Sequence, residues 1–226
     1  TYFNWEAGTI CFSESFESLS QGLQNALWEL GGVPKMHQTD CLTTAVQKTT
    51  HPDDFTRRYQ DLLDHYKLDG KKTNSNSPHE NGDVEQRHHR FKKAVEQSLF
   101  LRGSRDFADR NEYEQFLDKL FKQLNAGRKK RFSEEQAVLG GLPKHRIDAF
   151  KKSAMTVGPS STIRVNHNVY SVDSRLIGER INTRLFMDRV EIWYGQKKVD
   201  IMPRLRGEGK HRINYRHIID SLLRKP

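Results

Sequence analysis

The chain has 226 residues, of which 35% are hydrophobic and 30% charged, and its formal net charge is +9. This length and composition fit one large globular domain or two modest ones. No run approaches the roughly 18 apolar residues of a membrane span, and no signal-peptide pattern opens the chain. Cys11 and Cys41 lack metal-ligand spacing and fit a reduced compartment. The sequence therefore predicts a cytoplasmic protein that does not enter a membrane.

The charge is distributed unevenly along the chain. Residues 1–100 carry 11 Lys and Arg against 14 Asp and Glu, whereas residues 101–226 carry 27 against 15. An acidic-leaning front half followed by a basic back half predicts a cation site and then a surface that binds polyanions. Nucleic acid is the favoured polyanion, because binding to a membrane surface requires a basic amphipathic helix with large exposed apolar residues.

The first hundred residues alternate between strand and helix patterns, which is typical of an α/β domain. Ser13 or Ser15 is expected to cap the first helix, and Gly31 and Gly32 to stop it near Leu30. The predicted elements are strand, turn and strand over 1–13, a helix over 15–30, a strand over 33–39, a helix over 53–65, a strand over 66–68 and a helix over 81–101.

After residue 101 the pattern is first helical and then β. A helix over 106–124 is followed by a basic hinge at 128–131 and a short acidic helix over 133–139. Short alternating runs separated by Asn, Asp and Gly then fill 155–205. They predict a small closed β-barrel that forms a separate domain. A last helix is expected over 215–223.

Two carboxylates are placed where a metal site forms in an α/β domain. Asp40 ends a predicted strand and Glu85 lies in the first turns of a later helix. Strand ends and helix starts meet at one edge of such a sheet, which is where ligands bind. Carboxylate oxygens suit Mg²⁺, and two such ions that flank a phosphodiester stabilise both the attacking and the leaving oxygen. The alternative is that the two acids are ordinary surface residues.

A cationic face lies beside Glu85 on the same predicted helix. His89 is one turn beyond Glu85 and Lys92 two turns beyond, so both are expected to point toward a phosphate backbone. Lys93 and the amide of Asn81 are further candidate DNA contacts. A zinc site at His88 and His89 is disfavoured because adjacent histidines diverge on a helix, and a solvated basic face is the alternative.

The back half contributes two more candidate DNA-binding groups. The first is the basic hinge, with Arg128, Lys129 and Lys130. The second is a cluster in which Gly207 and Gly209 let the backbone follow a groove; its cations are Arg204, Arg206, Lys210, Arg212 and Arg216. Contacts between these cations and phosphates predict strongly salt-dependent DNA binding with little base reading. The alternative is a solvated basic end or a contact between subunits.

The sequences around the two acids resemble those of one protein family. LWELGGVPKMHQTDCLTTAV and HENGDVEQRHHRFKKAV are similar to IstA-type transposases of bacterial insertion sequences, which belong to the retroviral-integrase-like DDE superfamily. NHNVYSVDSRLIGERINTRLFMDRVEIWYGQKKV and MPRLRGEGKHRINYRHIIDSLLRKP resemble the C-terminal domain of the same family. The resemblance spans nearly the whole chain.

The resemblance implies an α/β fold with an RNase H-like catalytic core, a helical linker and a small SH3-like β-barrel. The implied boundaries are 1–102 for the core without its N-terminal strands, 103–152 for the linker, 153–206 for the barrel and 207–226 for a basic tail helix. Asp40 matches the second acid of the family's triad and Glu85 matches its glutamate. The first aspartate is expected upstream of Thr1, since the acids before Asp40 are all glutamates. The fragment alone is therefore expected to be inactive.

The resemblance also implies an activity and partners. A DDE transposase is a polynucleotidyl transferase that cleaves transposon DNA ends and joins the freed 3′-hydroxyl to target DNA, with two Mg²⁺ (or Mn²⁺) ions. The implied partners are double-stranded DNA, further copies of the chain and a helper ATPase of the IstB type, in the bacterial nucleoid. Two alternatives stay open: an inactive DNA-binding or architectural module that keeps the integrase fold, and an RNase H-like ribonuclease. The ribonuclease is disfavoured because it needs no appended basic barrel.

Overall fold

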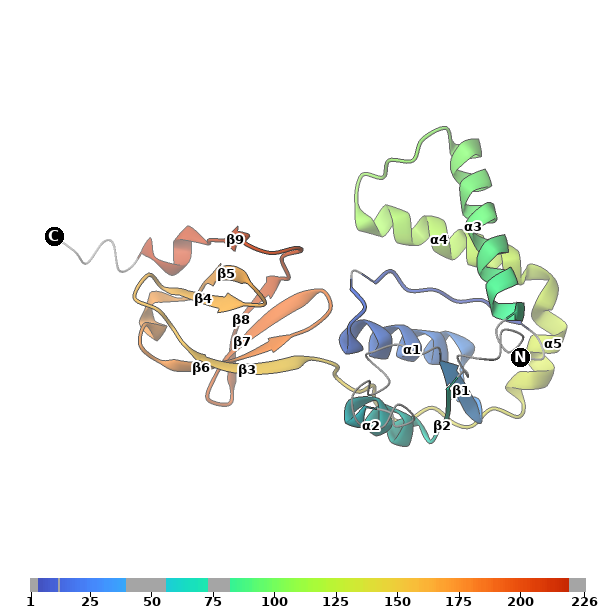
Figure 1. Cartoon of the computed structure of the whole chain (residues 1–226), viewed down its shortest axis with the longest axis horizontal. Coiled ribbons are helices and arrows are strands. Elements are labelled where there is room, and N and C mark those ends of the chain that lie inside the picture. Colours follow the sequence, from blue (N-terminus) through green and yellow to red (C-terminus); the bar gives the residue numbers. More distant parts are fainter. Residues whose placement is uncertain (1–3, 12, 40–55, 73–81, 220–226) are drawn as a thin grey trace. The chain divides into compact units, whose positions relative to one another are not determined.

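A computed structural model describes residues 4–11, 13–39, 56–72 and 82–219, apart from the side chains of residues 83 and 84. The chain divides into two compact units, Thr1–Ile147 and Asp148–Pro226 (Figure 1). Among the described residues, none of the helices combines the length and apolar character needed to cross a membrane.

Helices make up most of the first unit. Ser15 caps α1 by accepting a hydrogen bond from the Ser18 amide, and Gly31 ends it in a left-handed conformation with φ of 77°. This confirms the helix predicted over 15–30. The helices are α1 (Phe16–Leu30), α2 (Arg57–Tyr66), α3 (Gly82–Arg102), α4 (Arg110–Asn125) and α5 (Lys129–Gln136), with a 3₁₀ turn η1 (Ala126–Arg128) between α4 and α5.

The first unit also contains a pair of parallel strands. Strand β1 (Met36–Thr39) pairs with β2 (Asp69–Lys72), so that Thr39 lies opposite Lys72. The helices α1 and α2 pack together over an apolar cluster whose buried members are Leu27, Val33, Tyr59, Leu62, Leu63, Tyr66 and Leu68. Parallel pairing agrees with the α/β class expected for the front half of the chain.

Three local predictions for this unit are wrong. The described part of 1–13, residues 4–11 and 13, contains no strand. The strand expected at 66–68 is the end of α2, because Lys67 adopts a left-handed conformation with φ of 54° and closes the helix. The predicted hinge at 128–131 is helical, since η1 runs directly into α5.

Strands dominate the second unit, in two sheets. The first is antiparallel in the order β3 (Lys151–Thr156), β6 (Arg180–Leu185), β7 (Arg189–Tyr194) and β8 (Lys197–Pro203). The second holds β4 (Thr162–Val165), β5 (Asn168–Ser171) and β9 (His211–Arg212). A 3₁₀ turn, η2 (Ser174–Leu176), follows β5. Side chains from both sheets share one core, which includes Ile163, Tyr170, Ile181, Val190 and Ile192.

The strands expected over 155–205 are therefore present, but they do not close into a barrel: in the described residues they form two separate sheets. The tail helix expected from 215 begins instead as a 3₁₀ turn, η3 (Tyr215–His217), and residues 220–226 lie outside the described chain. The domain boundaries at 102, 152 and 206 stay predictions, as do the RNase H-like and SH3-like assignments.

Candidate functional site

The structure places one of the two predicted acids. Glu85 is exposed in the first turn of α3. Asp40 directly follows Thr39, the buried last residue of β1, and lies outside the described residues, as does Asn81. His89, Lys92 and Lys93 are exposed farther along α3. The strand-end and helix-start placement is thus present in part, and the distance between the two carboxylates stays a prediction.

The residues at this position suit a hard cation in their chemistry. Glu85 offers carboxylate oxygens, which Mg²⁺ and Mn²⁺ accept as ligands. Within residues 4–11, 13–39, 56–72 and 82–219, no group of three or more His, Cys, Asp or Glu side chains could hold a metal ion. A metal site at Glu85 therefore needs a ligand such as Asp40, from outside the described residues.

The segment before α1 fastens α3 to the helices that follow it. The Glu6 carboxylate lies 2.8 Å from Arg128 Nη2 and 3.6 Å from Arg87 Nη1, two residues beyond Glu85. Asn125, which is 2% exposed, accepts from the Glu6 amide at 3.0 Å and donates to the Glu6 carbonyl at 2.7 Å. Arg128 also donates to the Asn4 carbonyl. We call Asn4–Gly8 the strap.

Aromatic contacts support the strap at both ends. Trp5 stacks on Phe132 of α5 with ring centroids 4.3 Å apart. At Gly8 an added Cβ would lie 2.5 Å from Phe121, so only glycine allows this approach. Phe121 in turn stacks on Phe91 of α3 at 4.8 Å. The strap therefore contacts α4 and α5 directly and reaches α3 through both a charge pair and a ring stack.

Replacing Glu6 with Gln is expected to lower the free energy of unfolding of the first unit by about 1–2 kcal/mol, because two partly buried guanidinium groups lose their shared carboxylate. Amide hydrogen exchange in the first two turns of α3 should increase. Urea unfolding monitored together with exchange measures both effects. Glu14→Gln, at an exposed position outside the strap, is the control, and equal effects of the two substitutions would contradict a structural role for the strap.

A histidine–tyrosine pair joins β1, the strand that precedes Asp40 in the sequence, to α2. His37 Nδ1 is 2.6 Å from the hydroxyl of Tyr59, whose side chain is fully buried. Burial lowers the pKa of His37 and raises the pKa of Tyr59 to about 12. Both side chains are therefore neutral near pH 7, and their hydrogen bond ties β1 to α2. We interpret the pair as a support of the strand that precedes Asp40.

Lowering the pH below about 6.5 is expected to destabilise the first unit through His37. The pKa of His37 in the folded state is below the unfolded value of about 6.5, so the unfolded chain binds the proton first as the pH is lowered. The free energy of unfolding therefore decreases as the pH decreases, by at most about 1.4 kcal/mol per pH unit. His37→Gln should reduce the difference in unfolding free energy between pH 7.5 and pH 5.5. His88→Gln, at an exposed position on α3, is the control. An unchanged difference in the His37 variant would contradict this linkage.

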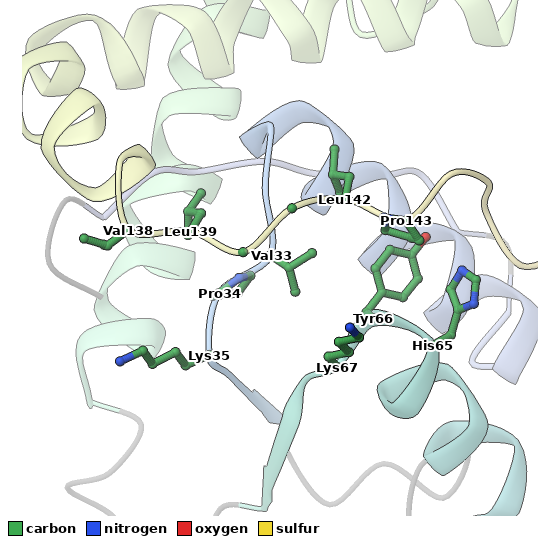
Figure 2. Close-up of a pocket in the computed structure, with 12 residues that line it drawn as sticks. Val33, Pro34, Lys35, His65, Tyr66, Lys67, Val138, Leu139, Leu142 and Pro143 are labelled. Carbon is green, nitrogen blue, oxygen red and sulfur yellow. The ribbon is translucent and has the colours of Figure 1, made fainter.

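A pocket of about 550 Å³ lies on the first unit, beside the start of β1 (Figure 2). The segment 138–143 forms one wall, held by paired hydrogen bonds of 2.9 and 2.8 Å between Val33 and Gly140. His65 and Tyr66 from the end of α2 line the other part. The twelve lining residues include Lys35 and Lys67 but no Asp or Glu. The pocket therefore lacks the carboxylates of the predicted metal site.

The predicted basic hinge is divided between structural and exposed side chains. The guanidinium of Arg128 is bound to Glu6 and also donates to Asn125 Oδ1 at 3.2 Å. Lys129 and Lys130 are exposed on α5. A contact between Arg128 and DNA would compete with the strap, whereas Lys129 and Lys130 are accessible. DNA contact by these three residues stays a prediction.

The predicted tail cluster is an ordered part of the second unit. Asn168, which is 1% exposed, donates to the Gly207 carbonyl at 2.7 Å and accepts from the Lys210 amide at 2.9 Å. Strand β9 then pairs with β5, with Arg212 opposite Tyr170. Lys210, Arg212 and Arg216 are exposed, Arg206 is half-buried, and Arg204 donates to the Phe186 carbonyl at 3.0 Å. Three of the five predicted cations are thus displayed on the surface of a fixed segment.

One face of the four-stranded sheet carries cations that were not among the predicted sites. The strands alternate between buried and outward positions: Ile181, Thr183 and Leu185 of β6 are buried, and the residues between them point away from the core. We call this surface the outer face. Its cationic residues are Lys152, Arg180, Arg184, Arg189 and Lys198.

Aromatic rings hold several of these cations. The Arg184 guanidinium lies 3.9 Å from the ring centroid of Trp193, and Lys198 Nζ lies 6.0 Å from the same ring. Arg189 lies 3.8 Å from the ring centroid of Phe186. Cation–π contacts of this kind restrict side chains that otherwise sample many rotamers. The outer face therefore presents cations in defined positions.

A single buried acid lies within the outer face. Glu191 is 5% exposed, accepts from Arg189 Nε and Trp193 Nε1, both at 3.1 Å, and lies 3.7 Å from Lys198 Nζ. Burial opposes its ionisation, but the hydrogen bonds from Arg189 and Trp193 and the nearby cations together hold the pKa of Glu191 below its usual value. Glu191 is therefore charged at neutral pH and orders the cations around it.

Sequence reasoning missed the outer face, although part of the signal was present. In RINTRL the residues Arg180, Asn182 and Arg184 occupy alternate positions, which assigns them to one side of their strand. In RVEIWY the same holds for Arg189, Glu191 and Trp193. The pairing register, with Asn182 opposite Trp193 and Trp193 opposite Lys198, is what gathers them into one surface.

The chain is similar to a transposase domain family and to two bacterial proteins. A protein family described as "Mu transposase, C-terminal domain" matches residues 142–214. An uncharacterized protein of Sinorhizobium fredii (strain NBRC 101917 / NGR234), y4jA/y4nE/y4sE, is 38% identical over 97% of this chain and 45% of its own length. A putative transposase for insertion sequence IS1162 of Pseudomonas fluorescens is 30% identical over 43% of this chain and 18% of its own length.

These matches support a transposase family. The family match covers the second unit up to residue 214 and adds residues 142–147, the end of the first unit. The chain spans less than half the length of either relative. Of these two relatives, the Pseudomonas fluorescens protein is the one described as a putative transposase, and the IstA-type assignment stays a prediction.

Proposed function

We propose that this chain is part of an IstA-type DDE transposase that cleaves transposon DNA ends and joins the 3′-hydroxyl to target DNA. The observation that carries the proposal is the placement of Glu85 on the first turn of α3, with the end of β1 directly before Asp40, in a chain whose C-terminal part matches a Mu transposase domain. The intact protein supplies the remaining aspartate.

In this proposal, different residues of the chain bind the metal ions and the DNA. Asp40 and Glu85 contribute carboxylate oxygens to two Mg²⁺ or Mn²⁺ ions, which when bound activate the attacking oxygen and stabilise the leaving one. His89, Lys92 and Lys93 follow Glu85 along α3 and bind the phosphates that flank the reacting bond. The strap holds α3 against the following helices, and it thereby fixes the position of the helix turn that carries Glu85.

The basic second unit binds DNA in this proposal. Lys210, Arg212 and Arg216 lie on an exposed segment anchored by Asn168. A homo-oligomer and a helper ATPase of the IstB type complete the reaction on DNA. Phosphate contacts position the chain without selecting a base sequence.

Binding of the chain to duplex DNA is expected to weaken steeply with salt, with a log–log slope of about −0.9 for each phosphate neutralised. A variant with Lys210, Arg212 and Arg216 all changed to Ala should give a slope shallower by about 2–3. Fluorescence anisotropy at several salt concentrations measures this. If the unmodified chain does not bind duplex DNA at low salt, the proposed function of the second unit is wrong.

A DNA-binding module without chemistry is the second candidate. The family match favours it in one respect, because residues 142–214 include neither Asp40 nor Glu85. The two candidates differ in the intact protein: only the transposase loses an activity when Glu85 is changed while its DNA binding persists.

A further inference from the structure

The outer face has the composition of a phosphate-binding surface. Its five cations come from all four strands of the sheet, β3, β6, β7 and β8. The pairing register places Lys152 opposite Arg184 and Arg184 opposite Glu191, so three strands contribute to one row. Lys152, Arg180 and Lys198 are exposed, and Arg184 and Arg189 are partly exposed.

The acids at the outer face leave an excess of positive charge. Glu191 lies within it and Asp188 at its rim, and both pair with Arg189, at 3.1 and 3.3 Å. Five cations against two acids favour a polyanion as the partner.

The Trp193 ring contacts cationic side chains of the outer face, which leaves it less available for stacking on a nucleobase. Arg184 and Lys198 come from the two strands that flank β7, and both approach the Trp193 ring. The indole also donates its N–H to Glu191 at 3.1 Å. Because these contacts occupy the half-buried ring, it is a poor platform for the base stacking that single-stranded nucleic acids require. A partner recognised through its phosphates fits this arrangement better.

The width of the face fits a duplex. Neighbouring strands are about 4.8 Å apart, so the three spacings from Lys152 on β3 to Lys198 on β8 span roughly 14 Å. This is close to the width of the DNA major groove, about 12 Å, which separates phosphates of the two strands. Cations at opposite edges of the sheet can therefore reach phosphates on both sides of one groove.

We propose that the outer face of the β3–β6–β7–β8 sheet binds the phosphate backbone of duplex DNA. Arg184 and Lys198 are its central contacts, and Trp193 is the residue that positions them. The inference rests on the proposed DNA function of the second unit and adds a site distinct from the cluster at residues 204–216.

The test compares two charge-matched double variants of the chain. Arg184→Gln with Lys198→Gln removes the central cations, and Arg105→Gln with Arg164→Gln removes two exposed cations elsewhere. Binding to duplexes of two unrelated sequences is measured by anisotropy from low to moderate salt. The first variant should bind at least about tenfold more weakly at low salt, with a slope shallower by about 2, and the control should match the unmodified chain. Unchanged melting temperatures exclude misfolding.

Trp193 is tested separately as a positioning residue. Trp193→Leu keeps every cation, so DNA affinity should fall while the charge is unchanged, and Trp193→Phe should restore most of it because a ring remains for the cations. Equal effects of the two charge variants would overturn the proposal, and so would equally tight binding of polyglutamate. If the unmodified chain fails to bind DNA, the proposed DNA-binding function of the second unit is wrong. If the unmodified chain binds DNA and the outer-face variant binds it equally well, the outer face alone is excluded as a DNA-binding site.

Discussion

Changing Glu85 to Gln is expected to abolish DNA strand cleavage and strand transfer by the intact protein. The amide keeps the shape of the side chain but lacks the charge that holds Mg²⁺. Loss of even an outer partner of a metal ligand reduces activity by 10–100-fold, so loss of the ligand itself should exceed about 100-fold. Cleavage of a labelled transposon-end duplex in Mg²⁺ buffer measures the effect.

DNA binding separates this outcome from misfolding. Glu85 is exposed on α3, so the substitution should leave the fold and the affinity for end DNA nearly unchanged. Glu96→Gln, at an exposed position farther along the same helix, is the matched control and should cleave normally. Cleavage by the Glu85 variant at the unmodified rate would contradict the catalytic assignment.

Replacing Ile192 with Ala should destabilise the second unit by about 2–5 kcal/mol. Ile192 is fully buried on β7, and truncation leaves a cavity in the core shared by the two sheets. Ile201 on the neighbouring strand β8 is 49% exposed, so Ile201→Ala should cost less than about 0.5 kcal/mol.

Because the second unit has its own core, the effect should be confined to it. Amide hydrogen exchange followed by mass spectrometry should show faster exchange across 148–219 in the Ile192 variant and unchanged exchange in α1 and α2. Equal acceleration in both units would contradict two separately stabilised cores.

Local signals in the sequence predicted the elements that local contacts determine. α1 begins at its Ser15 cap and ends at Gly31, and both signals lie next to the helix that they bound. The alternation in RINTRL and RVEIWY likewise predicted strands, and the structure has β6 and β7 there. The end of α2 was misjudged because Lys67 adopts a left-handed conformation, which sequence favours for Gly or Asn.

Contacts between distant residues account for the other differences. Residues 1–13, which include the strap, have the aromatic and β-branched composition of strands, yet Asn125, about 120 positions away, binds the backbone of Glu6. Arg128 begins a run of four cations that is typical of an exposed hinge. The Arg128 side chain instead pairs with Glu6, which is about 120 positions away in the sequence. The outer face depends on strand register, which the alternation of one strand cannot provide. For the predicted metal site, sequence placed Glu85 at a helix start, and its relation to Asp40 stays a prediction.

The most direct measurement is the anomalous diffraction of Mn²⁺ bound to crystals of the intact protein. The proposed function predicts an anomalous peak in contact with the carboxylates of Asp40 and Glu85, which should lie roughly 4–8 Å apart, as clamping of two metal ions requires. The peak should disappear in the Glu85→Gln variant. Carboxylates on opposite sides of the domain, or a peak that persists in this variant without contact to either residue, would contradict it.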